Sequence, residues 1–173
     1  MCSKFLMASV LVLSMAPSLA MAEHTRVTNP SAVSVEVLGR GLAYSVDYDQ
    51  VLNDQLAAGF GLGSFATQFR TADNLDANTT ILAIPVYANY YFMKEQGSPF
   101  VTAGATILTT TNGVGALQST LGGIKLSSSP VIPTFGVGYE NRGDGGFLFR
   151  ATAYGLIAST FAVWAGFDFG YAF

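Results

Sequence analysis

The sequence has few charged residues. They make up 11% of the 173 residues, while half of the chain is hydrophobic, and a typical soluble domain carries about 25% charged residues. Acidic residues outnumber basic ones, 11 to 8. Nucleic acid binds to basic surfaces, so this balance argues against it as a partner. The composition is therefore unlike that of an ordinary soluble domain.

Histidine and cysteine are nearly absent, with one residue of each, His24 and Cys2. A Ser-His-acid hydrolase needs a positioned histidine base, but His24 lies in a polar stretch near the N-terminus, away from the stretches that we expect to form strands. Cys2 lies in the expected leader, so the mature chain has no thiol, disulfide or cysteine metal site. The sequence predicts no enzyme, no cofactor and no metal.

Long hydrophobic runs are absent as well. The start of the chain combines Lys4, a short apolar run over 5–13, Pro17 and the triplet Ala20-Met21-Ala22, which is the pattern of a cleaved signal peptide. We expect a signal peptide over 1–22, a loose mature N-terminus over 23–30 and one domain over 31–173. No later run reaches the ~20 apolar residues of a spanning helix. An exported, hydrophobic chain without such a helix favours a closed transmembrane β-barrel.

The clearest pattern lies at the end of the chain, over 160–173. Aromatic or aliphatic residues occupy every second position from Phe161 to Phe173, and between them lie small or polar residues and Trp164. Side chains alternate between the two faces of a β-strand, so this stretch predicts a strand with one apolar face. Similar alternation recurs along the chain and predicts an all-β, eight-stranded antiparallel up-and-down barrel.

The expected connections are of two kinds. Short turns are predicted at Gly39–Gly41, Asn53-Asp54, 94–99 and 141–146, and longer polar loops at 70–79 and 111–129. Short turns at one end and long loops at the other are usual in membrane barrels. If Gly39–Gly41 were only a kink, seven strands would remain, and the sequence leaves this point open. Pro85 cannot donate a ladder hydrogen bond, so we expect a bulge or weak pairing there.

The two predicted faces differ sharply in charge. One is apolar, with aromatic residues towards the strand ends, as in the girdles at membrane interfaces. The other carries nearly all the strand charges: Glu36, Asp47, Asp49, Glu140, Arg150 and Asp168. In a membrane barrel these charges face a lumen that side chains fill. We expect Arg150, taken as the only basic residue on that face, to pair with some of the carboxylates.

The sequence resembles small bacterial outer-membrane β-barrels of OmpX-like architecture. The signal peptide, YSVDYDQVL, PVYANYYF, GYENRGDGGFLFRA and the terminal FDFGYAF carry the resemblance. It implies that Phe167, Phe169, Tyr171 and Phe173 form the signal recognised by the barrel-assembly machinery, after transit with periplasmic chaperones.

We therefore expect an integral protein of the outer membrane of a Gram-negative bacterium, in contact with its lipid. The favoured function is non-enzymatic, either structural or surface interaction, with loops 70–79 and 111–129 exposed to an unknown extracellular partner. A lipid-modifying enzyme, a narrow pore and a soluble periplasmic lipocalin-like ligand-binding barrel remain as alternatives. A soluble barrel would place its charged face outward.

Overall fold

The computed structural model describes residues 25–70, 76–110, 119–121, 124–126, 131–158 and 161–173. Eight strands close into an antiparallel barrel in the order β1-β10-β9-β8-β5-β4-β3-β2, which confirms the predicted fold class. The elements are α2 (Thr25–Thr28), β1 (Ser31–Leu38), η1 (Gly39–Gly41), β2 (Tyr44–Asn53), β3 (Leu56–Arg70), β4 (Asp76–Tyr91), β5 (Gly97–Thr110), β6 (Ser119–Leu121), β7 (Ile124–Leu126), β8 (Val131–Arg142), β9 (Phe147–Ile157) and β10 (Phe161–Ala172). No helix among these residues is long and apolar enough to cross a membrane.

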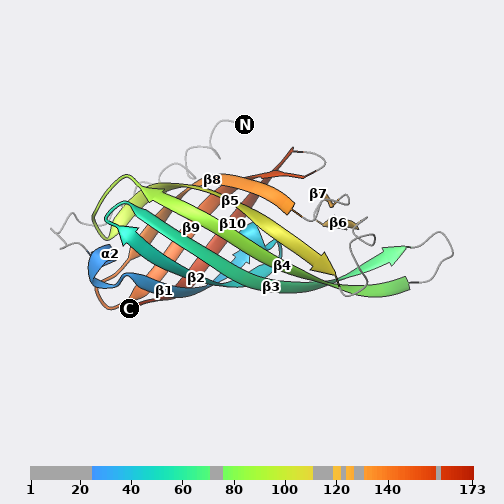
Figure 1. The fold of residues 1–173 in the computed structure, drawn as a ribbon, viewed down its shortest axis with the longest axis horizontal. Helices are drawn as coiled ribbons and strands as arrows, with labels where there is room; N and C mark the ends of the chain where they lie inside the picture. Colours follow the sequence, from blue (N-terminus) through green and yellow to red (C-terminus); the bar gives the residue numbers. More distant parts are fainter. Residues whose placement is uncertain (1–24, 71–75, 111–118, 122–123, 127–130, 159–160) are drawn as a thin grey trace, which may run out of the picture.

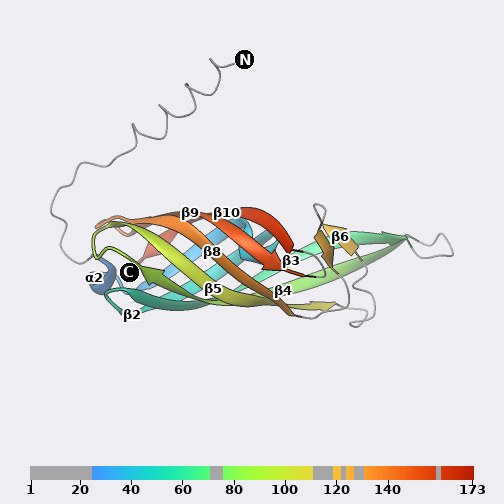
Figure 2. The ribbon, with the colours of Figure 1, turned by 90° about the horizontal axis from the view of Figure 1, so that it is seen from above.

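The first and last strands of the barrel close it. Ser31 and Phe173 exchange two backbone hydrogen bonds, of 3.0 and 2.8 Å. The C-terminus therefore lies beside α2, at what we call the terminal end of the barrel (Figures 1 and 2). The opposite end, which carries the β3–β4 hairpin and the small β6–β7 sheet, is the loop end.

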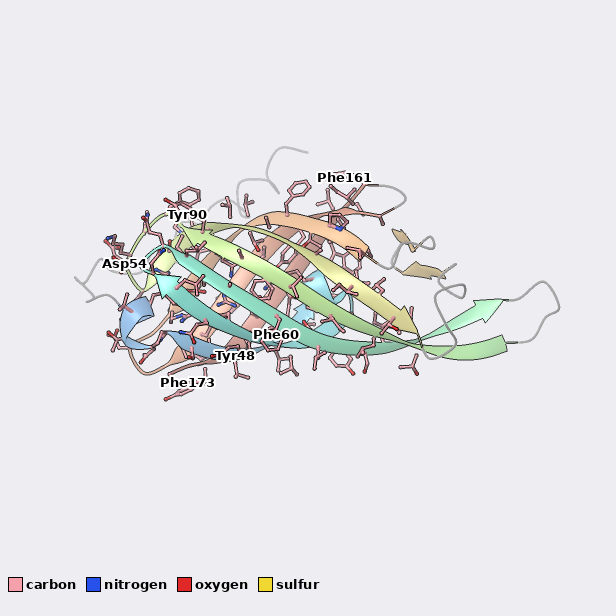
Figure 3. The ribbon with its side chains drawn as sticks, in the orientation of Figure 1. Tyr48, Asp54, Phe60, Tyr90, Phe161 and Phe173 are labelled. Carbon is pink, nitrogen blue, oxygen red and sulfur yellow. The ribbon has the colours of Figure 1, made fainter. Side chains whose placement is uncertain are left out.

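The outer wall is apolar, as predicted from the alternation. On β10, for example, Val163 is 74% exposed, whereas Asp168 is fully buried. Figure 3 shows outward side chains at both ends of the barrel, with Phe161 towards the loop end and Phe173 at the terminal end. The apolar face is therefore the exterior, and the charged face is the interior.

The structure also corrects some predicted boundaries. Both predicted loops contain strand: β3 and β4 remain paired out to Arg70↔Asp76, and 111–129 includes the β6–β7 hairpin. Backbone pairing does not require apolar side chains, so polar residues can extend a hairpin. The predicted loose N-terminus includes α2 over Thr25–Thr28. The predicted signal peptide lies outside the described residues.

The predicted turn at Gly39–Gly41 is a true connection, because β1 and β2 pair on either side of it, up to Val37↔Tyr44. Pro85 pairs with Thr106 on β5. Towards β3 the ladder has no pairs between Phe60↔Val86 and Gly63↔Ala83. The register is the same on both sides of this gap, so of the two expected alternatives weak pairing is confirmed and a bulge is not found.

Candidate functional site

The connection between β1 and β2 folds into the barrel. Leu38, Gly39 and Leu42 have positive φ angles of 62°, 67° and 69°. Two of them are leucines, for which this left-handed region is costly. The bend places Arg40 and Leu42 inside, at 1% and 0% exposure. η1 therefore fills part of the lumen instead of projecting into solvent.

Arg40 lies among aromatic rings and carboxylates. Its guanidinium carbon is 3.4 Å from the centroid of the Tyr87 ring. Its Nε lies 3.5 Å from Glu36 Oε1, and its Nη2 lies 3.8 Å from Asp168 Oδ1. Glu36 also accepts hydrogen bonds from the Arg40 backbone N–H and the Tyr154 hydroxyl, at 2.9 and 2.7 Å. These contacts fix η1 across the barrel, since their partners come from β1, β4, β9 and β10.

A second group of charges lies nearer the terminal end. Arg150 Nε donates to Glu140 Oε2 at 2.6 Å, and its Nη2 donates to Asp49 Oδ2. Arg142 Nη2 donates to Asp49 Oδ1 at 2.9 Å. All four side chains are fully buried. Charges without water are tolerated only when they are paired and hydrogen-bonded, and here each carboxylate receives hydrogen bonds from the arginines.

The segment before β1 closes the terminal end. Arg26, in α2, is 1% exposed and donates to Glu140 Oε1 and to the Met93 carbonyl, both at 2.9 Å. Its guanidinium carbon lies 4.2 Å from the centroid of the Tyr91 ring. Arg142 Nη1 donates to the Asn29 carbonyl at 2.8 Å. Residues 26–29 are thus bound to the barrel wall by buried contacts and are not loose.

We call these buried charges together the inner charged cluster. It comprises Arg26, Glu36, Arg40, Asp47, Asp49, Glu140, Arg142, Arg150 and Asp168. The structure brings the six charges predicted from the sequence into this interior. Asp47 accepts a hydrogen bond from Ser45 at 3.2 Å, and no ion pair joins it to another described residue.

The expectation that Arg150 is the only basic residue inside is wrong, because Arg26, Arg40 and Arg142 share the interior. They come from α2, η1 and the last residue of β8, and these segments lie outside the stretches whose alternation indicated a strand. The sequence did contain a signal for further arginines in the interior, namely the charge balance of the predicted inner face. Five buried carboxylates facing one arginine would leave most of them unpaired, which is costly.

The interior changes character towards the loop end. A buried apolar group fills it there, which we call the inner apolar cluster: Leu42, Phe65, Ile81, Ala83, Leu108, Ile132, Tyr154 and Leu156. The partly buried Ala43, Ala158, Ala162 and Trp164 pack against it. No group of acidic, histidine or cysteine side chains suited to a metal occurs among the described residues.

The four terminal aromatic residues predicted as an assembly signal all lie on the outer face. Phe167, Phe169, Tyr171 and Phe173 are 43%, 50%, 59% and 57% exposed. Phe169 contacts Phe149 of β9, with ring centroids 5.2 Å apart. The structure thus places these side chains on the surface, at the strand that closes the barrel.

Comparison with known proteins finds similarity in structure alone. No family model and no curated protein matches the chain. The N-terminal β-barrel domain of Pseudomonas aeruginosa OprF is similar, with a TM-score of 0.53 and 16% identity over 84% of this chain and 98% of that one. The chain has the fold of the small eight-stranded outer-membrane β-barrels. Yersinia pestis Ail, solved in phospholipid bilayer nanodiscs, has a TM-score of 0.49 and 14% identity over 84% and 99%. The expected resemblance to small outer-membrane barrels is confirmed at the level of fold.

Proposed function

We propose that this chain is an integral barrel of the outer membrane of a Gram-negative bacterium, with a structural or surface-interaction role and no catalysis. One observation carries the proposal: large apolar side chains cover the exterior while the inner charged cluster is buried. Val137 and Phe135, on β8, are 62% and 48% exposed, whereas Glu140 and Arg142 of the same strand are fully buried. Lipid is the solvent that suits such an exterior.

The connections support an orientation. At the terminal end, β2–β3, β4–β5 and β8–β9 are joined by short segments, 54–55, 92–96 and 143–146. The β3–β4 hairpin extends past the neighbouring strands at the loop end (Figure 2). In outer-membrane barrels short turns face the periplasm and long loops face outward. The loop end, with 70–79 and 111–129, would then meet any extracellular partner.

The interior argues against a pore and against an enzyme. Arg40 of η1 and Arg26 of α2 both extend into the lumen, at different positions along the barrel axis. In addition, the interior of an eight-stranded barrel is only wide enough to be filled by side chains. Four carboxylates of the interior form ion pairs with arginines. We infer that these carboxylates stabilise the barrel and do not act as a general acid or base. The only histidine of the sequence, His24, lies outside the described residues.

The proposal is tested by the gel mobility of the protein in membrane fractions. A closed barrel keeps its fold in detergent until it is boiled, so we expect boiled and unboiled samples to migrate differently and the protein to fractionate with the outer membrane. Deletion of Phe173 should impair assembly, because this residue ends the proposed assembly signal. Phe161→Ala, at the other end of the same strand, is the matched control and should assemble.

A soluble periplasmic protein without a mobility shift would contradict the proposal. Equal assembly of the Phe173 deletion and of Phe161→Ala would contradict the assembly role alone. Recordings from planar bilayers address the pore directly, and steady ion conductance by the folded barrel would favour that alternative.

A further inference from the structure

At the loop end, the barrel wall formed by β1 and β2 stops earlier than the wall formed by the other strands. β1 pairs with β10 only up to Leu38↔Gly166, and β2 pairs with β3 only up to Val46↔Leu62. On the far sides, β10 continues beside β9 to Phe161↔Ile157, and β3 continues beside β4 to Arg70↔Asp76. Between the upper part of β10, 161–165, and the upper part of β3, 65–70, no described strand completes the ladder. We call this gap the notch.

The inner apolar cluster itself is buried, and some of the side chains that pack against it beside the notch are partly accessible. All eight members of the cluster are at most 8% exposed, including Leu42 and Leu156 on the side of the notch. The residues that pack against the cluster and stay partly accessible are Ala43, next to β2, Ala158, after β9, and Ala162 and Trp164 on β10. Ala162 and Trp164 belong to the inward face of β10, since they alternate with the exposed Phe161 and Val163.

Small side chains beside the notch leave room for a ligand to reach the interior. Three of the four partly accessible residues are alanines. The lower corner of the notch, at Gly166, is closed, because Gly39 of η1 packs against Gly166, so access is confined to the part above it. The exterior surface at the same edge is strongly apolar. Val163 and Phe161 are 74% and 62% exposed, and the Phe161 ring stacks on Phe135 with centroids 6.1 Å apart. Apolar side chains therefore line both faces of β10 at this edge, with Phe161 and Val163 outside and Ala162 and Trp164 inside.

We propose that the notch admits a hydrocarbon chain of a surrounding membrane lipid into contact with Trp164 and the alanines that pack against the inner apolar cluster. This inference rests on the proposed membrane location. The occupant follows from the chemistry of the side chains along the path: those of the outer wall and those of the interior are both apolar there, and the charges of the interior lie below, towards the terminal end. The outer wall at this edge would already be bathed in acyl chains, so an acyl chain is the nearest ligand of matching chemistry.

Trp164 makes the proposal testable without any mutation. It is the only tryptophan in the sequence, and it faces the interior beside the notch. The folded protein is reconstituted in phosphatidylcholine vesicles with or without bromine atoms on the acyl chains, which quench tryptophan fluorescence on contact. We expect brominated lipid to quench Trp164 at least half as strongly as a tryptophan on the outer wall.

Two reference variants calibrate the measurement, both in a Trp164→Phe background. Val163→Trp places the indole on the outer wall next to the same edge. Phe100→Trp places it in the interior near the terminal end, where Phe100 is 2% exposed, and it should be quenched little. In the native background, Ala162→Leu fills the space beside Trp164 and should lower its quenching at least twofold. The gel mobility shift shows which variants are folded.

Each outcome separates the alternatives. Quenching of Val163→Trp but not of native Trp164 would overturn the notch as a lipid site and leave the membrane location intact. Absence of quenching in both would contradict the membrane location itself. Quenching of Trp164 by aqueous iodide, with no effect of brominated lipid, would show that water fills the notch. Protection from both quenchers, together with a cross-linked dimer, would assign the notch to a second copy of the chain.

Discussion

The barrel interior is filled mainly by charged side chains in the half near the terminal end and by apolar side chains in the half near the loop end. Near the terminal end, charged side chains from α2, β2, β8 and β9 satisfy one another in fixed pairs, such as Arg150 with Glu140 at 2.6 Å. Near the loop end, Leu108, Ile132 and their neighbours make non-directional apolar contacts. The charged half lies where all eight strands pair into a complete ring, and the apolar half lies at the height of the notch, where the ring is incomplete.

This coincidence has a physical reason. A buried ion pair requires defined geometry, because the attraction has to offset the hydration that both charges lose. A complete ring of strands holds that geometry. Apolar packing tolerates an opening towards lipid, because hydrocarbon can replace side-chain contacts at little cost. The comparison therefore predicts that substitutions act differently in the two halves.

The largest effect is expected from Arg150→Met. This substitution removes the cation that Asp49 and Glu140 share. Breaking a buried pair by removing one partner costs about 3–5 kcal/mol, so the free energy of unfolding in urea and the midpoint of the gel mobility shift should both fall. The double variant Arg150→Met/Glu140→Gln should recover part of the loss. An unchanged midpoint in Arg150→Met would contradict a structural role for the pairing.

A smaller effect is expected from Leu108→Ala in the apolar half. Leu108 is 2% exposed, and truncation of a buried leucine costs about 2–5 kcal/mol, with the lower values where neighbours can relax into the space. Because the notch opens this half to lipid, we expect a value near the lower limit in bilayers. The same measurement in short-chain detergent is the control. A loss larger than that of Arg150→Met would reverse the proposed ranking of the two halves.

The smallest effect is expected from Lys94→Ala, outside both halves. Lys94 Nζ lies 2.7 Å from Asp54 Oδ2, but the two side chains are 53% and 38% exposed. Exposed ion pairs contribute about 0–1 kcal/mol and are screened by salt. The unfolding midpoint should therefore move little, at low or high salt. A loss comparable to that of Arg150→Met would show that burial does not decide the strength of these pairs.

The sequence predicted what repeats along the strands. The two-residue alternation of Val33, Val35 and Val37, or of Phe167, Phe169 and Tyr171, identifies a face, and the charge on the opposite face indicates which way it points. Gly39–Gly41 was predicted as a turn from its glycines. These features follow from local geometry, so they can be derived without knowledge of the neighbouring strands.

What could not be predicted depends on contacts between distant residues. Arg40 enters the lumen because η1 bends inward to reach Tyr87 and Glu36, and neither glycine nor arginine in a turn indicates the direction of the bend. Arg26 is fixed by Glu140, 114 positions along the chain. The notch depends on where the pairing of β1 with β10 and of β2 with β3 stops. Alternation alone does not define these limits.

The central claim is that the apolar face contacts lipid and the charged face is inside, and a nitroxide scan along β8 tests it most directly. Single cysteines, introduced in a Cys2→Ser background, are spin-labelled from Val131 to Glu140 in reconstituted vesicles. We predict maxima of oxygen accessibility at every second position, Val131, Pro133, Phe135, Val137 and Tyr139, where the structure has exposed side chains. Higher accessibility of those positions to a water-soluble nickel chelate than to oxygen would contradict the account.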